Sequence, residues 1–282
     1  MIRIITDSAA DLTPQDLAQP GVYVVPMAVT FEDGSSVEDD GRMTKDEFFE
    51  RLAADSKLPR TSQPSPATFI EAYTDAELAG DEAIVITVAQ KLSGTYQCAV
   101  MAADDVDTPI YVVDSETATQ GEAMILREAL RLRDMGLSAQ QIVEMLERFK
   151  KRVRIVAVVD SLKHLQKGGR VSAAVALVGG ALGIKPVISL YDSTVKLVGK
   201  GRGRPGALVA MFKQLDEMGC VDTNYPCVVL YSDEKQMAGP VHHYLTQNLK
   251  LEGVRVSQIG ATIGTHVGPR ATGIVFVAKE TV

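Results

Sequence analysis

The chain has 282 residues and a formal net charge of -7, with 46% hydrophobic and 23% charged side chains. This composition is typical of globular proteins and excludes a disordered chain, and the length suits one large domain or two moderate ones. The negative balance disfavours nucleic acid as a partner, because an acidic protein repels a phosphate backbone.

Short apolar runs alternate with amphipathic stretches over the first half of the chain, a pattern that predicts βαβ units. Predicted strands cover residues 2–6, 22–30, 83–88, 110–113 and 153–159. The predicted helices start at a capping box on Thr44, at the pair Ser65-Pro66, at Thr119 and at a second capping box on Ser138. The last three should end near residues 78, 134 and 150.

The pattern changes after about residue 160. A short helix over 161–167 and an apolar segment over 171–183 precede a predicted hairpin, whose strands 186–190 and 195–199 flank the turn Tyr191-Asp-Ser-Thr194. Then follow a helix (205–218), a strand (227–231), a helix (234–249) and two strands (254–259 and 273–278). The expected fold class is therefore α/β, with a parallel-sheet domain over residues 1–152 and an α+β domain over 153–282.

Cysteine usage and hydropathy both indicate the cytoplasm. The three cysteines, Cys98, Cys220 and Cys227, form no CxxC pair and are too few for a disulfide framework. A charged pair follows only a short apolar run at the N-terminus, so we expect no signal peptide. The apolar stretch over 171–184 is shorter than the ~18 residues that span a bilayer. We expect it to be a buried or ligand-lining helix.

Polar loops follow several predicted strands, which is where open α/β sheets bind ligands. Ser93, Gly94 and Thr95 resemble an anion-binding corner at a helix N-terminus, although an ordinary N-cap serine explains them equally well. The loops at 6–12 and 114–115 have an alternative as plain turn chemistry. The hydroxyl-rich stretch over 60–66 has an alternative as a linker.

Lysine and arginine lie beside glycine at 167–170 and 200–204. This composition suits the binding of a carboxylate or phosphate group. The alternative is that these are solvated charges on the surface. The formal GxGxxG at 201–206 follows a hairpin and is a poor dinucleotide signature. His266 lies in a glycine-flanked segment, which predicts a loop that faces a cleft. Without HExxH or a carboxylate cluster, no metal is expected. Ser93 and His266 leave open a hydrolase pair, but GxSxG is absent.

Seven ordered motifs resemble those of the DegV family, the bacterial fatty-acid-binding proteins that include the binding subunit of fatty acid kinase. They span nearly the whole chain: TDSAADL (6–12), TSQPSP (61–66), LSGTYQ (92–97), VVDSETAT (112–119), LQKGGR (165–170), GIKPV (183–187) and IGTHVGP (263–269).

The resemblance implies two α/β domains with a long acyl tunnel and no cofactor beyond the bound long-chain fatty acid. By motif position, Thr61, Ser93, Gly94, Thr95 and His266 are expected to hold or neighbour the carboxylate. An apolar lining suits the chain, since each buried methylene contributes about 0.8 kcal/mol.

The resemblance also implies that Arg170 and Arg202 contact the phosphoryl group or a kinase partner, with Arg204 as a less certain candidate. The protein would then present its ligand to a separate ATP-dependent subunit, because this chain lacks GxxxxGK[ST]. We expect a lipid-binding protein rather than an enzyme, a monomer, and at most transient membrane contact. The alternatives are an acyl-hydrolase that uses Ser93 and His266, and a sensor of a non-lipid small molecule.

Overall fold

A computed structural model describes residues 1–172 and 183–280 of the chain. The N-terminal part contains a four-stranded, wholly parallel sheet in the order β2-β1-β6-β7. Its strands are β1 (Ile2–Asp7), β2 (Val22–Val25), β6 (Glu82–Thr87) and β7 (Ile110–Asp114). The parallel-sheet α/β architecture predicted for this half is confirmed.

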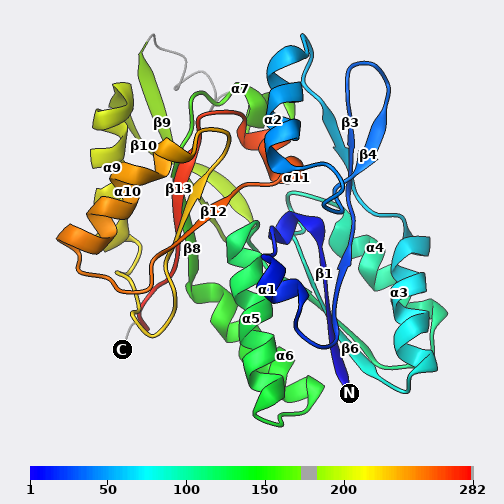
Figure 1. Ribbon diagram of the computed structural model, residues 1–282. Helices are drawn as coiled ribbons and strands as arrows, with labels where there is room; N and C mark the ends of the chain where they lie inside the picture. Colours follow the sequence, from blue (N-terminus) through cyan, green and yellow to red (C-terminus); the bar gives the residue numbers. More distant parts are fainter. Residues whose placement is uncertain (173–182, 281–282) are drawn as a thin grey trace.

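Helices cover both faces of this sheet (Figure 1). Ile5 and Val85 pack with α3 (Pro66–Leu78) and α4 (Thr95–Ala102) on one face. Ile4 packs on the other face with α5 (Gln120–Asp134) and α6 (Ala139–Phe149). Burial on two faces explains why these strands are continuous apolar runs rather than alternating ones.

Local capping signals located the helix starts correctly. Thr44 forms the predicted capping box with Glu47 at the start of α2 (Lys45–Ala54). Ser138 does the same with Gln141 before α6, and the Ser65 hydroxyl accepts a hydrogen bond from the backbone of Thr68 at the start of α3. These predictions hold because a cap satisfies backbone N–H groups within a few residues.

The strand predicted over 22–30 is wrong, since two strands in two different sheets occupy this range. Pro26 follows β2 and lacks an N–H for the ladder, so pairing stops there. The chain then enters a three-stranded antiparallel sheet in the order β4-β3-β5, which the sequence did not predict. Its strands are β3 (Ala28–Thr30), β4 (Ser36–Glu38) and β5 (Arg60–Ser62).

The C-terminal part is built on a mixed six-stranded sheet in the order β10-β9-β8-β13-β11-β12. Its strands are β8 (Val153–Val158), β9 (Ile184–Tyr191), β10 (Thr194–Arg202), β11 (Val228–Tyr231), β12 (Arg255–Gln258) and β13 (Thr272–Val277). The predicted hairpin is confirmed as β9–β10. Its turn residues Asp192 and Ser193 have φ of 55° and 57°, as a type I′ turn requires.

The helices of this part are α9 (Gly203–Glu217), α10 (Gly239–His243) and α11 (Ala261–Val267). α9 packs beside the β9–β10 hairpin (Figure 1). The helix predicted over 234–249 is divided into a 3-10 turn (Lys235–Ala238), α10 and a π-helical turn (Tyr244–Asn248). Gly239 and Pro240 stand at the first junction, where proline removes a helical donor.

Short turns connect these elements. They are η1 (Ser8–Ala10), α1 (Pro14–Leu17), η2 (Ala103–Asp105), η3 (Lys150–Arg152) and α7 (Lys163–Lys167). The short helix predicted over 161–167 is therefore confirmed as α7, with a later start. Residues 173–182 of the predicted apolar segment lie outside the described part of the chain.

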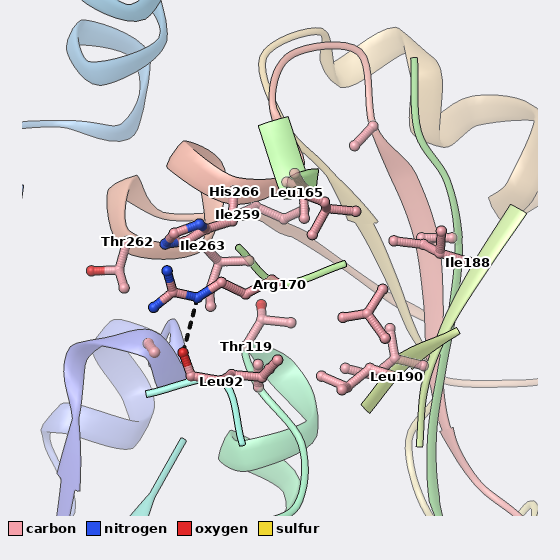
Figure 2. Close-up of a pocket in the computed structure, with 18 of the residues that line it drawn as sticks. Leu92, Thr119, Leu165, Arg170, Ile188, Leu190, Ile259, Thr262, Ile263 and His266 are labelled. Carbon is pink, nitrogen blue, oxygen red and sulfur yellow. Dashed lines mark hydrogen bonds between the residues drawn. The ribbon is translucent and has the colours of Figure 1, made fainter. Parts of the chain in front are cut away.

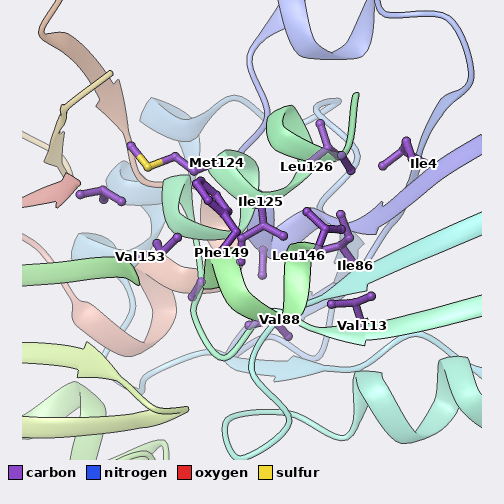
Figure 3. Packing of buried hydrophobic residues seen from close by; sticks show 14 of the residues in the cluster. Ile4, Ile86, Val88, Val113, Met124, Ile125, Leu126, Leu146, Phe149 and Val153 are labelled. Atoms are coloured by element: carbon purple, nitrogen blue, oxygen red, sulfur yellow. The ribbon is translucent and has the colours of Figure 1, made fainter. Parts of the chain in front are cut away.

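One hydrophobic cluster joins the two parts of the molecule (Figure 3). It combines Ile4 and Ile86 of the parallel sheet with Val153 and Val275 of the mixed sheet, and Phe149 at the end of α6 belongs to the same cluster. The change from one sheet to the other falls between β7 and β8, whereas the buried side chains continue across it.

Candidate functional site

A partly open cavity lies between the carboxyl ends of the parallel strands and the mixed sheet. Most of its walls are aliphatic and come from both parts of the chain, including Leu92, Leu165, Ile188, Leu190, Ile259 and Ile263. No acidic side chain of the described residues lines it. Such walls favour an apolar ligand.

Polar side chains gather at one end of the cavity (Figure 2). Arg170 and His266 lie at that end, and Ile188 and Leu190 lie away from them. Thr61 of β5 and His266 of α11 are joined there by a 2.8 Å contact between the threonine Oγ1 and the histidine Nε2. The cavity therefore has a polar end and an aliphatic end, which matches the shape of an amphiphile.

Ser93 also lines the cavity, just before α4. Its Oγ lies 2.8 Å from the Oγ1 of Thr95, and Gly94 is the N-cap of the helix without a side-chain cap. The Gln63 side chain packs over Gly94, where a Cβ would lie 2.9 Å from its Cδ. Gly94 therefore leaves room for Gln63, and together with Thr95 it lies behind Ser93 rather than among the residues that line the cavity.

The guanidinium of Arg170 is fixed by backbone carbonyls. Its Nε donates to the carbonyl of Leu92 at 2.9 Å, and its Nη1 donates to the carbonyl of Gly168. Partial burial lowers the pKa of Arg170 from its ordinary value, although arginine stays charged under all ordinary conditions. Arg170 thus places a positive charge at the polar end of the cavity.

His266 is neutral at physiological pH. Burial, followed by the positive charge of Arg170 and the proximity of His164, lowers the pKa of His266 to about 4. Its Nδ1 has no hydrogen-bond partner among the described residues. One ring nitrogen is therefore engaged by Thr61, and the second is buried beside Gly168.

The hydrolase alternative requires Ser93 and His266 to act as a pair. In the described structure Ser93 bonds Thr95, His266 bonds Thr61, and no hydrogen bond joins the serine to the histidine. A nucleophile and its base need such contact, so the geometry does not favour this chemistry.

The predicted arginines separate in the structure. Arg170 lines the cavity, whereas Arg202 is exposed at the N-cap of α9. Arg204 donates from Nη1 to the carbonyl of Arg270 at 2.8 Å, and neither it nor Arg202 is among the described lining residues. The sequence placed these arginines in one functional group, but the structure brings only Arg170 to the polar end.

A second cleft adjoins the polar end of the cavity. It shares Thr61, Arg170 and His266 with the cavity. The cleft also contains the basic side chains Lys57, Arg60, His164 and Lys167, and none of its described lining residues is acidic. This basic cleft therefore offers an anion a route to the head of any ligand in the cavity, in a chain whose net charge is negative.

The histidine loop predicted around residue 266 is wrong, because His266 belongs to α11. Gly264 lies inside this helix for a packing reason: a Cβ there would lie 2.7 Å from Phe48 and 2.8 Å from Phe49. The sequence also missed Thr119 and Thr262, which line the cavity. No local pattern marks these two threonines, since only long-range packing brings them there.

The loops that follow β1 and β7 serve the fold. Asp7 accepts hydrogen bonds from the backbone of Ala9 and Val88, and Asp114 accepts from Gln90 and Glu116. The bonds from Ala9 and Glu116 are local turn contacts, whereas those from Val88 and Gln90 join each loop to the segment after β6. Within residues 1–172 and 183–280 no group of three or more potential metal ligands occurs, and no helix is long and apolar enough to cross a membrane.

The whole chain is similar to known proteins. A family model described as "Uncharacterised protein, DegV family" matches residues 1–279. A DegV domain-containing protein of Caldanaerobacter subterraneus is 35% identical over 280 residues, covering 99% of each chain. Another from Deinococcus radiodurans is 34% identical over 277 residues, covering 97% of each.

Solved structures agree in fold. A fatty-acid-binding DegV family protein from Thermus thermophilus is 31% identical, with a TM-score of 0.88. A stearic acid-binding protein from Eubacterium ventriosum is 29% identical, with a TM-score of 0.89. In both comparisons 99% of each chain is covered.

Proposed function

This chain belongs to the DegV family, and from that premise we propose that it binds a long-chain fatty acid with the carboxyl group at the polar end of the cavity. The observation that carries the proposal is the cavity that is aliphatic along its walls and polar at one end. Burial of each methylene contributes about 0.8 kcal/mol, so an acyl chain in such a cavity binds strongly.

In this proposal Thr61, Ser93, Gly94, Thr95 and His266 form the carboxylate site. The hydroxyls of Thr61 and Ser93 donate to the carboxylate, and the neutral His266 ring orients Thr61 by donating its single N–H, on Nε2, to the threonine oxygen. The backbone at Gly94 and Thr95 adds the free N–H groups at the start of α4. The 2.8 Å contact between Thr61 and His266 supports this assignment. A buried carboxylate needs such donors, because an unsatisfied charge is costly to bury.

We further propose that a separate ATP-dependent kinase subunit phosphorylates the bound fatty acid. A carboxylate oxygen attacks the γ-phosphorus of ATP, the bond to the bridging oxygen breaks, and ADP leaves with that electron pair, which yields an acyl-phosphate. The basic cleft supports this step, because Lys57, Arg60 and Lys167 attract a phosphate group. Burial and the neighbouring lysines lower the pKa of His164, so its ring contributes little positive charge. Arg170 and Arg202 serve the phosphoryl group or the docked kinase.

The same proposal treats the chain as two domains divided at residue 152, because each of the two larger sheets lies on one side of that residue. It acts as a cytoplasmic monomer that meets a membrane only transiently. The exposed Cys220 and the absence of a CxxC pair suit a reducing compartment.

Mass spectrometry of the purified protein, native and after organic extraction, tests the binding proposal. A stoichiometric adduct that extracts as a free fatty acid is expected. No adduct and no uptake of added palmitate or oleate would refute it, and turnover of an acyl ester that Ser93→Ala abolishes would establish the hydrolase instead.

The Arg170→Ala variant tests whether Arg170 serves the phosphoryl group or the kinase rather than the bound carboxylate. It should retain fatty acid while losing acyl-phosphate formation with the kinase and ATP. Loss of fatty acid from the folded variant would show that Arg170 holds the carboxylate itself.

A further inference from the structure

The helix that carries His266 begins without a cap of its own. Gly260 is the N-cap of α11 and provides no side chain. The first N–H groups of a helix need acceptors, and here acceptors come from distant parts of the chain. Two aspartates from the N-terminal part, Asp11 and Asp39, provide them.

Asp39 follows β4 and binds the first turn of α11. Its Oδ2 accepts from the backbone N–H of Thr262 at 3.1 Å and from the Thr262 hydroxyl at 2.6 Å. Thr262 is 3% exposed and lines the cavity. Burial and the neighbouring Asp11 raise the pKa of Asp39, so the Thr262 donors are what stabilise its charge.

Asp11 connects α11 to the opposite wall of the cavity. Its Oδ1 accepts from the backbone N–H of Gly260 at 2.7 Å, and Lys45 lies 3.3 Å away. Its Oδ2 accepts from the hydroxyl of Thr119 at 2.6 Å. Thr119 lines the cavity with φ of 48°, a conformation that a β-branched residue adopts only under constraint.

Packing and hydrogen bonds together hold α11 in place. The rings of Phe48 and Phe49 on α2 lie against Gly264, which sets how closely the two helices approach. The hydrophobic attraction between these groups is not directional, whereas a hydrogen bond has a preferred distance and angle. The hydrogen bonds to Gly260 and Thr262 therefore restrict rotation about the helix axis and displacement along it.

We propose that Asp11 and Asp39 are positioning residues of the carboxylate site: by bonding the start of α11 they determine where His266 meets Thr61. This inference rests on the proposed fatty-acid function, yet its consequence for His266 exists without ligand. A small shift of α11 would lengthen the 2.8 Å contact between Thr61 and His266.

Two measurements on full-length variants test the inference: the imidazole NMR signal of His266 in ligand-free protein, assigned with His266→Asn, and the dissociation constant for palmitate. Asp39→Ala should shift the signal and weaken binding by about tenfold, as expected for loss of hydrogen bonds to a charged group. Asp39→Asn should restore the wild-type NMR signal of His266 and bring the palmitate dissociation constant within about threefold of the wild-type value. One amide oxygen can accept hydrogen bonds from both Thr262 donors.

Asp16→Ala is the matched control. Asp16 also uses one carboxylate oxygen to accept from the N–H and the hydroxyl of a threonine, Thr13, at 2.9 and 2.7 Å, and it is 6% exposed. It lies outside the cavity lining, so its loss should lower the melting temperature without moving the His266 signal or the palmitate affinity.

The outcomes separate the two proposals. A folded Asp39→Ala protein with the wild-type His266 signal and affinity would overturn the positioning role. If that variant does not fold, Asp39→Glu replaces it. A wild-type His266 signal in Asp39→Glu would also contradict the positioning role. If wild-type protein binds no palmitate, the fatty-acid function fails, while the His266 signal still decides the positioning role.

Discussion

Replacing Gly168 by alanine should weaken ligand binding through His266 alone. Gly168 closes α7 with φ of -73°, which alanine adopts without strain. A Cβ built there lies 3.0 Å from the Cε1 of His266 and closer still to its Nδ1. Carbon atoms pack at about 3.5 Å or more, so the ring must retreat by roughly 1 Å. The 2.8 Å contact with Thr61 does not survive such a shift.

The size of the effect follows from what the shift leaves behind. A buried polar group without its partner costs about 1–3 kcal/mol. A central value of about 2 kcal/mol corresponds to about thirtyfold weaker fatty-acid binding. The lost contact also lowers the free energy of unfolding by about 1–3 kcal/mol, and the restricted unfolded chain of the alanine variant returns about 0.4–1 kcal/mol of this. The net cost is smaller than the stability of about 5–15 kcal/mol that is typical of a folded protein, so Gly168→Ala should stay folded while it binds fatty acid more weakly.

Palmitate dissociation constants and urea unfolding curves for wild type and Gly168→Ala provide the assay. Gly239→Ala is the control, because Gly239 has φ of -53° and its added Cβ meets nothing within 4 Å. If Gly168→Ala binds palmitate as tightly as the control, His266 does not need this position, and the reasoning is refuted.

Two further changes probe the cavity. Leu190→Phe adds volume at the end of the cavity away from His266. Each methylene of the ligand that it excludes should lower affinity about fourfold. Dissociation constants for fatty acids of increasing chain length check this, and an equal loss of affinity at every length would contradict it. Because His266 has a folded-state pKa of about 4 against 6.5 when exposed, its stabilising contribution is complete above about pH 6.5 and falls by about 3 kcal/mol at pH 4. Urea unfolding of ligand-free protein checks this. Between pH 7 and pH 4 the free energy of unfolding should fall by about 3 kcal/mol less in His266→Asn than in wild type. An equal fall in the two proteins would contradict it.

Sequence-based prediction succeeded where the controlling interaction is local. Residues close in sequence form the capping boxes at Thr44 and Ser138 and the type I′ turn at Asp192. These features can therefore be predicted from the sequence. Prediction failed around His266, where α2 requires glycine at position 264 and leaves no local pattern because it is distant in the chain. Over 22–30 a local signal was present, since Pro26 lacks the N–H that a continuous strand needs.

The site shows the same division. Family resemblance indicated Thr61, Ser93, Arg170 and His266, all of which line one cavity. Gly94 and Thr95 lie behind that lining, and Arg202 lies apart from it. Their proposed roles stay predictions until binding and phosphorylation are measured.

By itself the sequence determined the α/β class, the helix starts, the hairpin and the chemical character of the motifs, because these depend on backbone propensities and nearby partners. Only the tertiary structure decided that Thr61 meets His266 across 205 positions of sequence, and that Asp11 and Asp39 bind the start of the helix carrying that histidine. Such contacts depend on how two sheets pack around one core, and the shape of that packing is a property of all the side chains together.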